Sequence, residues 1–143
     1  TRDWSSDVCS SDLMIETDTI ARILAAIVGA AVAWAGAQKL TALGTWLAAA
    51  RAQSLPRAVA LVVPPVELLL GASLLVTEPA AVTLGAVTAL LLVFTVFLAV
   101  QVSAGSTVPC ACFGTRASRP PSGRDIARNV LMIAALVAAA ALN

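Results

Sequence analysis

Two cysteines separated by a single residue are the sharpest chemical feature of this sequence. Cys110 and Cys112 lie in the segment PCACFG, residues 109–114. Thiols at this spacing can form an intramolecular disulfide that is usually strained, and strain makes a disulfide easier to reduce. A bridge that closes so short a loop adds little to stability. The spacing therefore favours dithiol–disulfide exchange by a Cys110/Cys112 redox pair over a structural cross-link.

Neighbouring residues bear on the reactivity of this pair. Arg116, Arg119 and the start of the following apolar segment would favour the thiolate, which is the reactive form. Two other interpretations stay open from the residues alone. The thiolates could bind Cu(I), a metal that soft ligands suit, or both cysteines could be small buried residues without chemistry.

Glu67 is the second distinctive group, because it lies in the middle of an apolar segment one turn after Pro64 and Pro65. A carboxylate at that depth of a membrane is costly, so it should face other helices and either bind a proton or ligand or join helices by hydrogen bonds. The prolines should break or kink the helix and free carbonyl groups that need partners. The candidate partners of the carboxylate are Gln38, Lys39, Thr88 and Arg128.

Arg128 and Asn129 open the last apolar segment, close to the cysteine loop. They could form a positive, hydrogen-bonding wall for the thiol site. Alternatively, Arg128 extends its charge to the membrane surface and Asn129 lies in the interface. With Glu67, they are the candidate supporting polar groups.

Composition limits the class of protein. Of 143 residues, 59% are hydrophobic and 12% are charged, and the mean hydropathy is +0.92. A soluble domain has roughly 25% charged residues, so a soluble, disordered, collagen-like or nucleic-acid-binding chain is excluded. The absence of His removes Ser-His-Asp and Cys-His catalytic pairs, His-ligated haem and nearly every zinc or di-iron site. We therefore expect no metal site, no bound cofactor and no nucleic-acid partner.

The first 13 residues differ from everything that follows. The eleven residues from Asp3 to Leu13 match the codon-by-codon translation of a sequencing-library adaptor. We interpret residues 1–13 as an adaptor-derived, disordered segment and expect the domain to cover 14–143. Removing the segment leaves eight basic and five acidic residues, and it leaves Cys110 and Cys112 as the remaining cysteines.

Four apolar segments follow, each about as long as a membrane helix requires. Apolar residues surround these segments on all sides, as in helices without a water-facing side. We predict an all-α fold, an integral membrane antiparallel four-helix bundle, with spans of about 19–39, 58–76, 80–102 and 126–142.

The connections between the spans differ in length. Residues 40–57 form the first, in which Trp46 is expected to be an interfacial anchor. Residues 77–79 form a tight helical hairpin, and the long irregular loop 103–125 carries both cysteines. Long irregular loops often carry function, so the thiol site is expected in the last connection.

Basic residues predict the orientation in the membrane. Only Arg22 lies at the side where the chain begins and ends. The opposite side holds Lys39, Arg51, Arg57, Arg116, Arg119, Arg124 and Arg128. The charge bias places a multi-pass protein in the plasma membrane with its cysteine loop in the cytoplasm.

Several motifs together resemble the MauE/DoxX-like family of membrane proteins. The specific part is CFG at residues 112–114, preceded by Cys110 and followed by Arg128-Asn129. The segments WAGAQKL at 34–40 and PVELLLG at 65–71 extend the likeness over nearly all of residues 20–142, and the AGxxKL part is shared with the wider DoxX group.

The resemblance implies a four-helix membrane protein associated with redox chemistry. MauE-type members are associated with methylamine utilisation, in which they support disulfide formation or maturation of methylamine dehydrogenase beside a thioredoxin-like protein. It also implies Cys110 and Cys112 as the redox pair, and Glu67, Arg128 and Asn129 as supporting groups. A scaffold or assembly module, or a small Cu(I)-handling or transport protein, is the alternative function. Maturation of an exported enzyme would place the thiols outside the cell, in conflict with the charge bias.

Overall fold

A computed structural model describes the backbone of residues 4–109 and 119–143, with side chains from Met14 onward within these ranges. Cys110 and Cys112, the predicted redox pair, and the neighbouring Arg116 lie outside the described residues.

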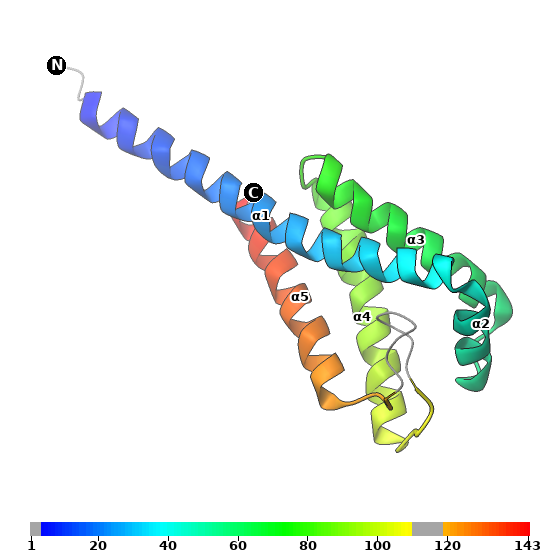
Figure 1. The fold of residues 1–143 in the computed structure, drawn as a ribbon. Helices are drawn as coiled ribbons and strands as arrows, with labels where there is room; N and C mark the ends of the chain where they lie inside the picture. Colours follow the sequence, from blue (N-terminus) through cyan, green and yellow to red (C-terminus); the bar gives the residue numbers. More distant parts are fainter. Residues whose placement is uncertain (1–3, 110–118) are drawn as a thin grey trace.

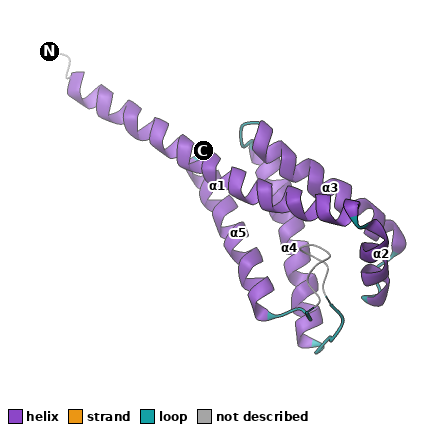
Figure 2. Cartoon of the chain, in the orientation of Figure 1, coloured by secondary structure: helices purple, strands orange, loops and turns teal. Residues whose placement is uncertain are grey.

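The described chain is all-α, without strands (Figures 1 and 2). Four of its helices contain a stretch long and apolar enough to cross a membrane, which confirms the predicted fold class. The short second helix was not expected from the sequence, which predicted only a connection over residues 40–57. The helices are α1 (Trp4–Thr41), α2 (Leu43–Ala52), α3 (Arg57–Val76), α4 (Ala81–Ser103) and α5 (Gly123–Leu142).

The boundaries agree with the sequence at most helix ends and differ at the start. The tight connection between α3 and α4 is confirmed, since α3 ends at Val76 and α4 begins at Ala81. In contrast to the disorder expected for residues 1–13, the backbone from Trp4 is helical and continuous with the first span, and its first turns project past the other helices (Figure 1). The interpretation of residues 1–13 as an adaptor-derived segment stays a prediction.

Helix α1 packs most closely against α3, because glycines remove the side chains that would separate the two backbones. A Cβ atom on Gly36 would lie 2.6 Å from the amide nitrogen of Leu68. One on Gly29 would lie 2.8 Å from the carbonyl oxygen of Gly71, and one on Gly71 would collide with the backbone of Ala33. The close approach explains why this pair of helices can hold polar side chains between them.

The other interior surface joins α1, α4 and α5. Small residues of α1, such as Ala25 and Val28, meet larger ones such as Leu91 of α4 and Leu136 of α5, all at most 2% exposed. Outward-facing positions of the spans carry large apolar side chains, among them Trp34, which is 67% exposed. This inside-out distribution is that of helices whose outer surface meets lipid rather than water.

Candidate functional site

A buried ion pair joins α1 to α3 in the interior of the bundle. The Lys39 Nζ atom donates to both carboxylate oxygens of Glu67 at 2.6 Å, and the residues are 0% and 1% exposed. Of the four candidate partners of Glu67, the structure selects Lys39. An isolated charge at this depth would be strongly destabilising, so each group makes the burial of the other tolerable.

Two aromatic rings lie close to the ammonium group of this pair. Lys39 Nζ lies 5.1 Å from the ring centroid of Trp46 on α2 and 5.5 Å from that of Phe94 on α4. Both distances fall within the range of cation–π attraction. Side chains from α2 and α4 therefore also contact the ion pair that joins α1 and α3.

Trp46 has a second role that follows from a proline. Pro64 has no backbone N–H, so the carbonyl of Ala60, four residues earlier, cannot receive its usual helical hydrogen bond. The Trp46 Nε1–H group donates to that carbonyl at 2.6 Å. The partner expected for a freed carbonyl is thus found, while α3 remains one helix through both prolines instead of breaking.

The prediction that Trp46 is an interfacial anchor is wrong in this structure. Trp46 is 4% exposed and packs with Ala50 of α2 and Ala60 of α3. Among the aromatic residues whose burial the structure describes, Trp34 is the exposed one. From composition alone, a tryptophan beside an apolar segment can lie either at the membrane interface or inside the protein. Here Pro64 leaves the Ala60 carbonyl without its helical donor, and Trp46 lies inside, where it supplies that donor.

Asn129 is a second buried polar group, and it belongs to α5. It is 0% exposed, and neither its amide nitrogen nor its amide oxygen has a hydrogen-bond partner among the described residues. Ile126, about one turn earlier, packs against Leu98 of α4, and Phe94 is about one turn before Leu98. Asn129 therefore lies at nearly the same depth of the bundle as the ring next to Lys39, inside the protein and not in the interface.

Arg128 belongs to a polar cluster at the start of α5, not to the buried pair. The Arg128 Nη2 atom lies 3.6 Å from Asp125 Oδ1, and Arg119 donates to the same carboxylate at 2.8 Å. Asp125 and Ser122 also form a capping box at the helix N-terminus. The local sequence carries the signal for it, a Ser followed three residues later by an acidic residue.

The two described ends of the cysteine loop are both tied to helices. At one end, the Gln53 side chain at the end of α2 donates to the carbonyl of Pro109 at 2.9 Å. At the other, Arg119 donates to the Ser122 hydroxyl at 2.9 Å as well as to Asp125. Pro109, the residue before Cys110, is thus bound at the end of α2, and Arg119, at the other described end of the loop, is bound at the start of α5.

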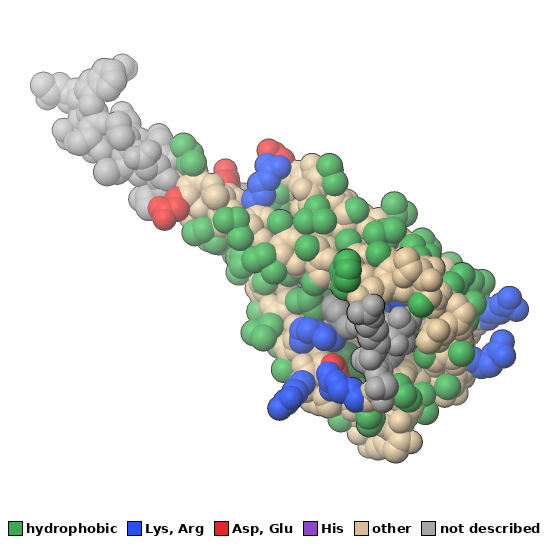
Figure 3. Space-filling model, viewed as in Figure 1, with side chains coloured by type: hydrophobic (Ala, Val, Ile, Leu, Met, Phe, Trp, Pro, Cys, Tyr) green, Lys and Arg blue, Asp and Glu red, His purple; other side chains and the backbone are tan. Residues whose placement is uncertain are grey.

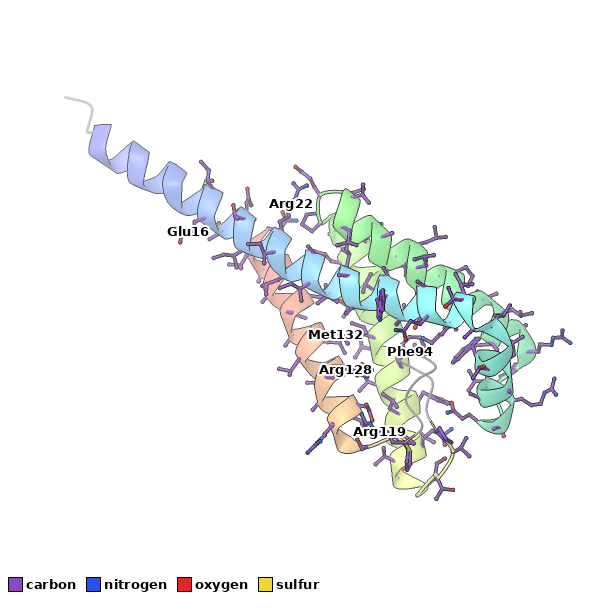
Figure 4. All side chains as sticks on the ribbon, viewed as in Figure 1. Glu16, Arg22, Phe94, Arg119, Arg128 and Met132 are labelled. Carbon is purple, nitrogen blue, oxygen red and sulfur yellow. The ribbon has the colours of Figure 1, made fainter. Side chains whose placement is uncertain are left out.

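Basic side chains gather at this end of the molecule. Figure 3 shows Lys and Arg side chains over α2 and α3 at its right-hand edge and over the lower end of α5, and Figure 4 labels Arg119 and Arg128 in the latter group. At the opposite end, Arg22 lies 3.7 Å from Glu78. Among the described residues, the charge asymmetry read from the sequence thus corresponds to two opposite ends of the bundle.

Comparisons with known proteins agree with this architecture. A family model described as methylamine utilisation protein MauE matches residues 17–142. A curated methylamine utilization protein MauE from Paracoccus denitrificans is 40% identical over 85 residues, which cover 59% of this chain and 46% of that protein. The match thus spans about half the length of this relative. No solved structure matches the chain.

Proposed function

The chain belongs to the MauE family of multi-pass membrane proteins, and we propose that it supports disulfide exchange or maturation of a partner enzyme through Cys110 and Cys112. The observation that carries the proposal is a Cys-x-Cys pair in a chain of this family. By the name of the family, the pathway would be methylamine utilisation.

The proposed chemistry is a balanced thiol–disulfide exchange. A thiolate of the Cys110/Cys112 pair attacks a disulfide of the partner, and one partner sulfur leaves as a thiolate. The second cysteine then attacks the mixed disulfide, so the pair becomes oxidised as the partner becomes a dithiol. Two electrons and two protons pass to the partner, and the reverse sequence oxidises it.

The described surroundings of the loop support this chemistry. Gln53 holds Pro109, the residue before Cys110, and the arginine–carboxylate cluster of Arg119 and Asp125 holds the other end. Anchored ends reduce the conformational freedom of a reactive loop, and nearby cations favour the thiolate. The supporting roles proposed for Arg128 and Asn129 follow from their places at the start of α5. Arg128 is charged, and the buried amide of Asn129 has no hydrogen-bond partner within residues 14–109 and 119–143.

Glu67 acts in this proposal through Lys39. The pair fixes the distance between α1 and α3 and, through the Trp46 ring, the place of α2. Helix α2 ends at Ala52, directly before Gln53, whose side chain holds Pro109. A change at Glu67 would therefore reach the loop through contacts of Lys39 with Trp46 and through α2 to Gln53. Glu67 is therefore a positioning residue.

The partner in this proposal is a thioredoxin-like protein, and the location is the plasma membrane with the cysteine loop in the cytoplasm. Charge asymmetry supports this sidedness, and the anchoring of the loop at the basic end of the bundle agrees with it. Labelling Cys112 in sealed cells with a membrane-impermeant maleimide tests it in a Cys9→Ser, Cys110→Ser background. Protection until the membrane is permeabilised is expected, and labelling from outside would reverse the orientation.

The function itself is tested by exchange with a thioredoxin. The reduced protein in vesicles is mixed with oxidised thioredoxin, and the free thiols of both proteins are counted by alkylation and mass spectrometry. Cys9→Ser protein, the matched control, should transfer electrons as fast as the unaltered chain, and Cys110→Ser/Cys112→Ser protein should not. Full support of partner-enzyme maturation by the double variant would instead identify a scaffold.

A further inference from the structure

We propose that an anionic phospholipid binds at the basic end of the bundle, with its phosphate between Arg51 and Arg57 and an acyl chain between α3 and α4. The site is independent of the thiol chemistry. Its groove borders the buried ion pair, because Phe94 lines the groove and its ring centroid lies 5.5 Å from Lys39 Nζ. It rests on a basic pocket and an apolar groove that share one wall.

The basic pocket lies where α2 ends and α3 begins. It has a volume of about 250 Å³, and its lining combines Arg51 and Arg57 with Leu47, Leu55 and Ala60. Both arginines are exposed, and within the described part of the chain neither forms an ion pair. Figure 3 shows basic side chains projecting over α2 and α3 at the right-hand edge of the molecule. The pocket thus offers positive charge above an apolar floor.

The first turn of α3 adds to the positive potential of this pocket. Arg57 is the first residue of α3, no side chain caps this helix, and no acidic residue lies in its first turn. The free N–H groups at a helix N-terminus carry a partial positive charge. Arg57 also begins the membrane-spanning segment, so the pocket lies at the depth of lipid headgroups, where each basic residue attracts anionic lipid.

The apolar groove continues from the pocket toward the middle of the membrane. Helices α3 and α4 diverge from their hairpin (Figure 1), and a groove of about 460 Å³ opens between them. All its lining residues are apolar, among them Val63, Ala89 and Phe97. Leu55 lines both the groove and the basic pocket. A molecule with an anionic head and an apolar chain fits this combination, whereas free phosphate would use only the pocket.

Native mass spectrometry of the full chain in detergent tests the headgroup part of the proposal. The probes are palmitoyl-oleoyl-phosphatidylglycerol and palmitoyl-oleoyl-phosphatidylcholine, which share their acyl chains. We expect tighter binding of phosphatidylglycerol, and a loss of about fivefold in its affinity for Arg51→Gln or Arg57→Gln protein. Arg124→Gln, which removes an exposed arginine from α5, is the matched control and should change this affinity by less than twofold.

A groove variant tests the acyl-chain part. Ala89→Trp should fill the groove and lower the affinity for both lipids, whereas Val96→Trp, on an exposed face of the same helix, should not. Unchanged phosphatidylcholine binding by the arginine variants would verify that they are folded. Equal affinities for the two lipids, or an equal loss with Arg124→Gln, would overturn the headgroup assignment, and equal effects of the two tryptophans would overturn the groove assignment.

Discussion

The ammonium nitrogen of Lys39 lies 2.6 Å from both carboxylate oxygens of Glu67, and neither residue is more than 1% exposed. The two residues are 28 positions apart and lie on different membrane-spanning helices. Gly36 makes the approach possible, because any side chain there would meet the backbone of α3. The pair therefore fixes the relative positions of α1 and α3.

Removing one partner should destabilise the protein far more than removing both. Lys39→Met or Glu67→Leu leaves a buried group without its partner and should lower the free energy of unfolding by about 3–5 kcal/mol. The double variant Lys39→Met/Glu67→Leu has no charge to bury and should recover most of this loss. Denaturant unfolding in detergent measures all three, and a double variant whose loss equals the sum of the two single losses would contradict the interpretation.

Part of what Trp46 contributes to stability should come from its hydrogen bond to the Ala60 carbonyl, which Pro64 leaves without a helical donor. Trp46→Phe keeps an aromatic ring but leaves the Ala60 carbonyl without a donor, so the free energy of unfolding should fall by about 1–3 kcal/mol. Trp34→Phe, on the outer surface, is the matched control and should cost less than about 0.5 kcal/mol.

The same idea predicts an interaction between two substitutions. In a Pro64→Ala background, the new N–H group can satisfy the Ala60 carbonyl within the helix. Trp46→Phe should then cost clearly less than in the unaltered protein, and a double-mutant cycle of thermal unfolding measures the difference. Equal costs in the two backgrounds would mean that the hydrogen bond to Ala60 contributes nothing.

Glycine substitutions should separate close helix packing from general helix propensity. Gly36→Ala places a Cβ atom 2.6 Å from the Leu68 nitrogen and should lower the free energy of unfolding by about 1–3 kcal/mol as the helices move apart. Gly85→Ala meets nothing within 4 Å and should be neutral or stabilising by up to about 1 kcal/mol. Similar values for both variants would argue against a tight contact at Gly36.

Sequence reasoning located the spans and the polar groups but not how they meet. Glu67 is recognisable because a carboxylate in an apolar segment needs a partner, and the apolar span of about 58–76 around it predicts a membrane helix. The choice of Lys39 among four candidates depends on the contact of α1 with α3, which is set by glycines at three separate positions. Sequence periodicity within one helix carries no information about such a crossing.

Trp46 and Phe94 show the same limit from another direction. Composition predicts an interfacial place for Trp46, and in the sequence Phe94 is one of many apolar residues of the span 80–102. Their proximity to Lys39 comes from α2 and α4 approaching the pair from different parts of the chain. The capping box of Ser122 and Asp125, in contrast, is a local pattern and could have been predicted.

Asn129 should matter for exchange more than for stability. Its amide has no hydrogen-bond partner in the described part of the chain, so Asn129→Leu should leave the free energy of unfolding unchanged or raise it. If the amide supports the thiol site, the rate of exchange with thioredoxin should fall about tenfold, the value of one hydrogen bond to a charged group. A loss of stability with an unchanged exchange rate would instead assign Asn129 a structural role.

The redox titration of Cys110 and Cys112 tests the central claim most directly. Cys9→Ser protein is equilibrated in glutathione buffers of graded potential, quenched with acid and alkylated, and its free thiols are counted by mass spectrometry. We predict a single two-electron transition from two alkylated cysteines to none. Its midpoint should lie above about −300 mV, because structural disulfides have reduction potentials below this value and exchangeable ones lie above it. Cys110→Ala in the same background has no second thiol to close a disulfide, so Cys112 should be found either alkylated or bound to one glutathione, two states of different mass. Two thiols that stay free in every oxidising buffer would contradict the account.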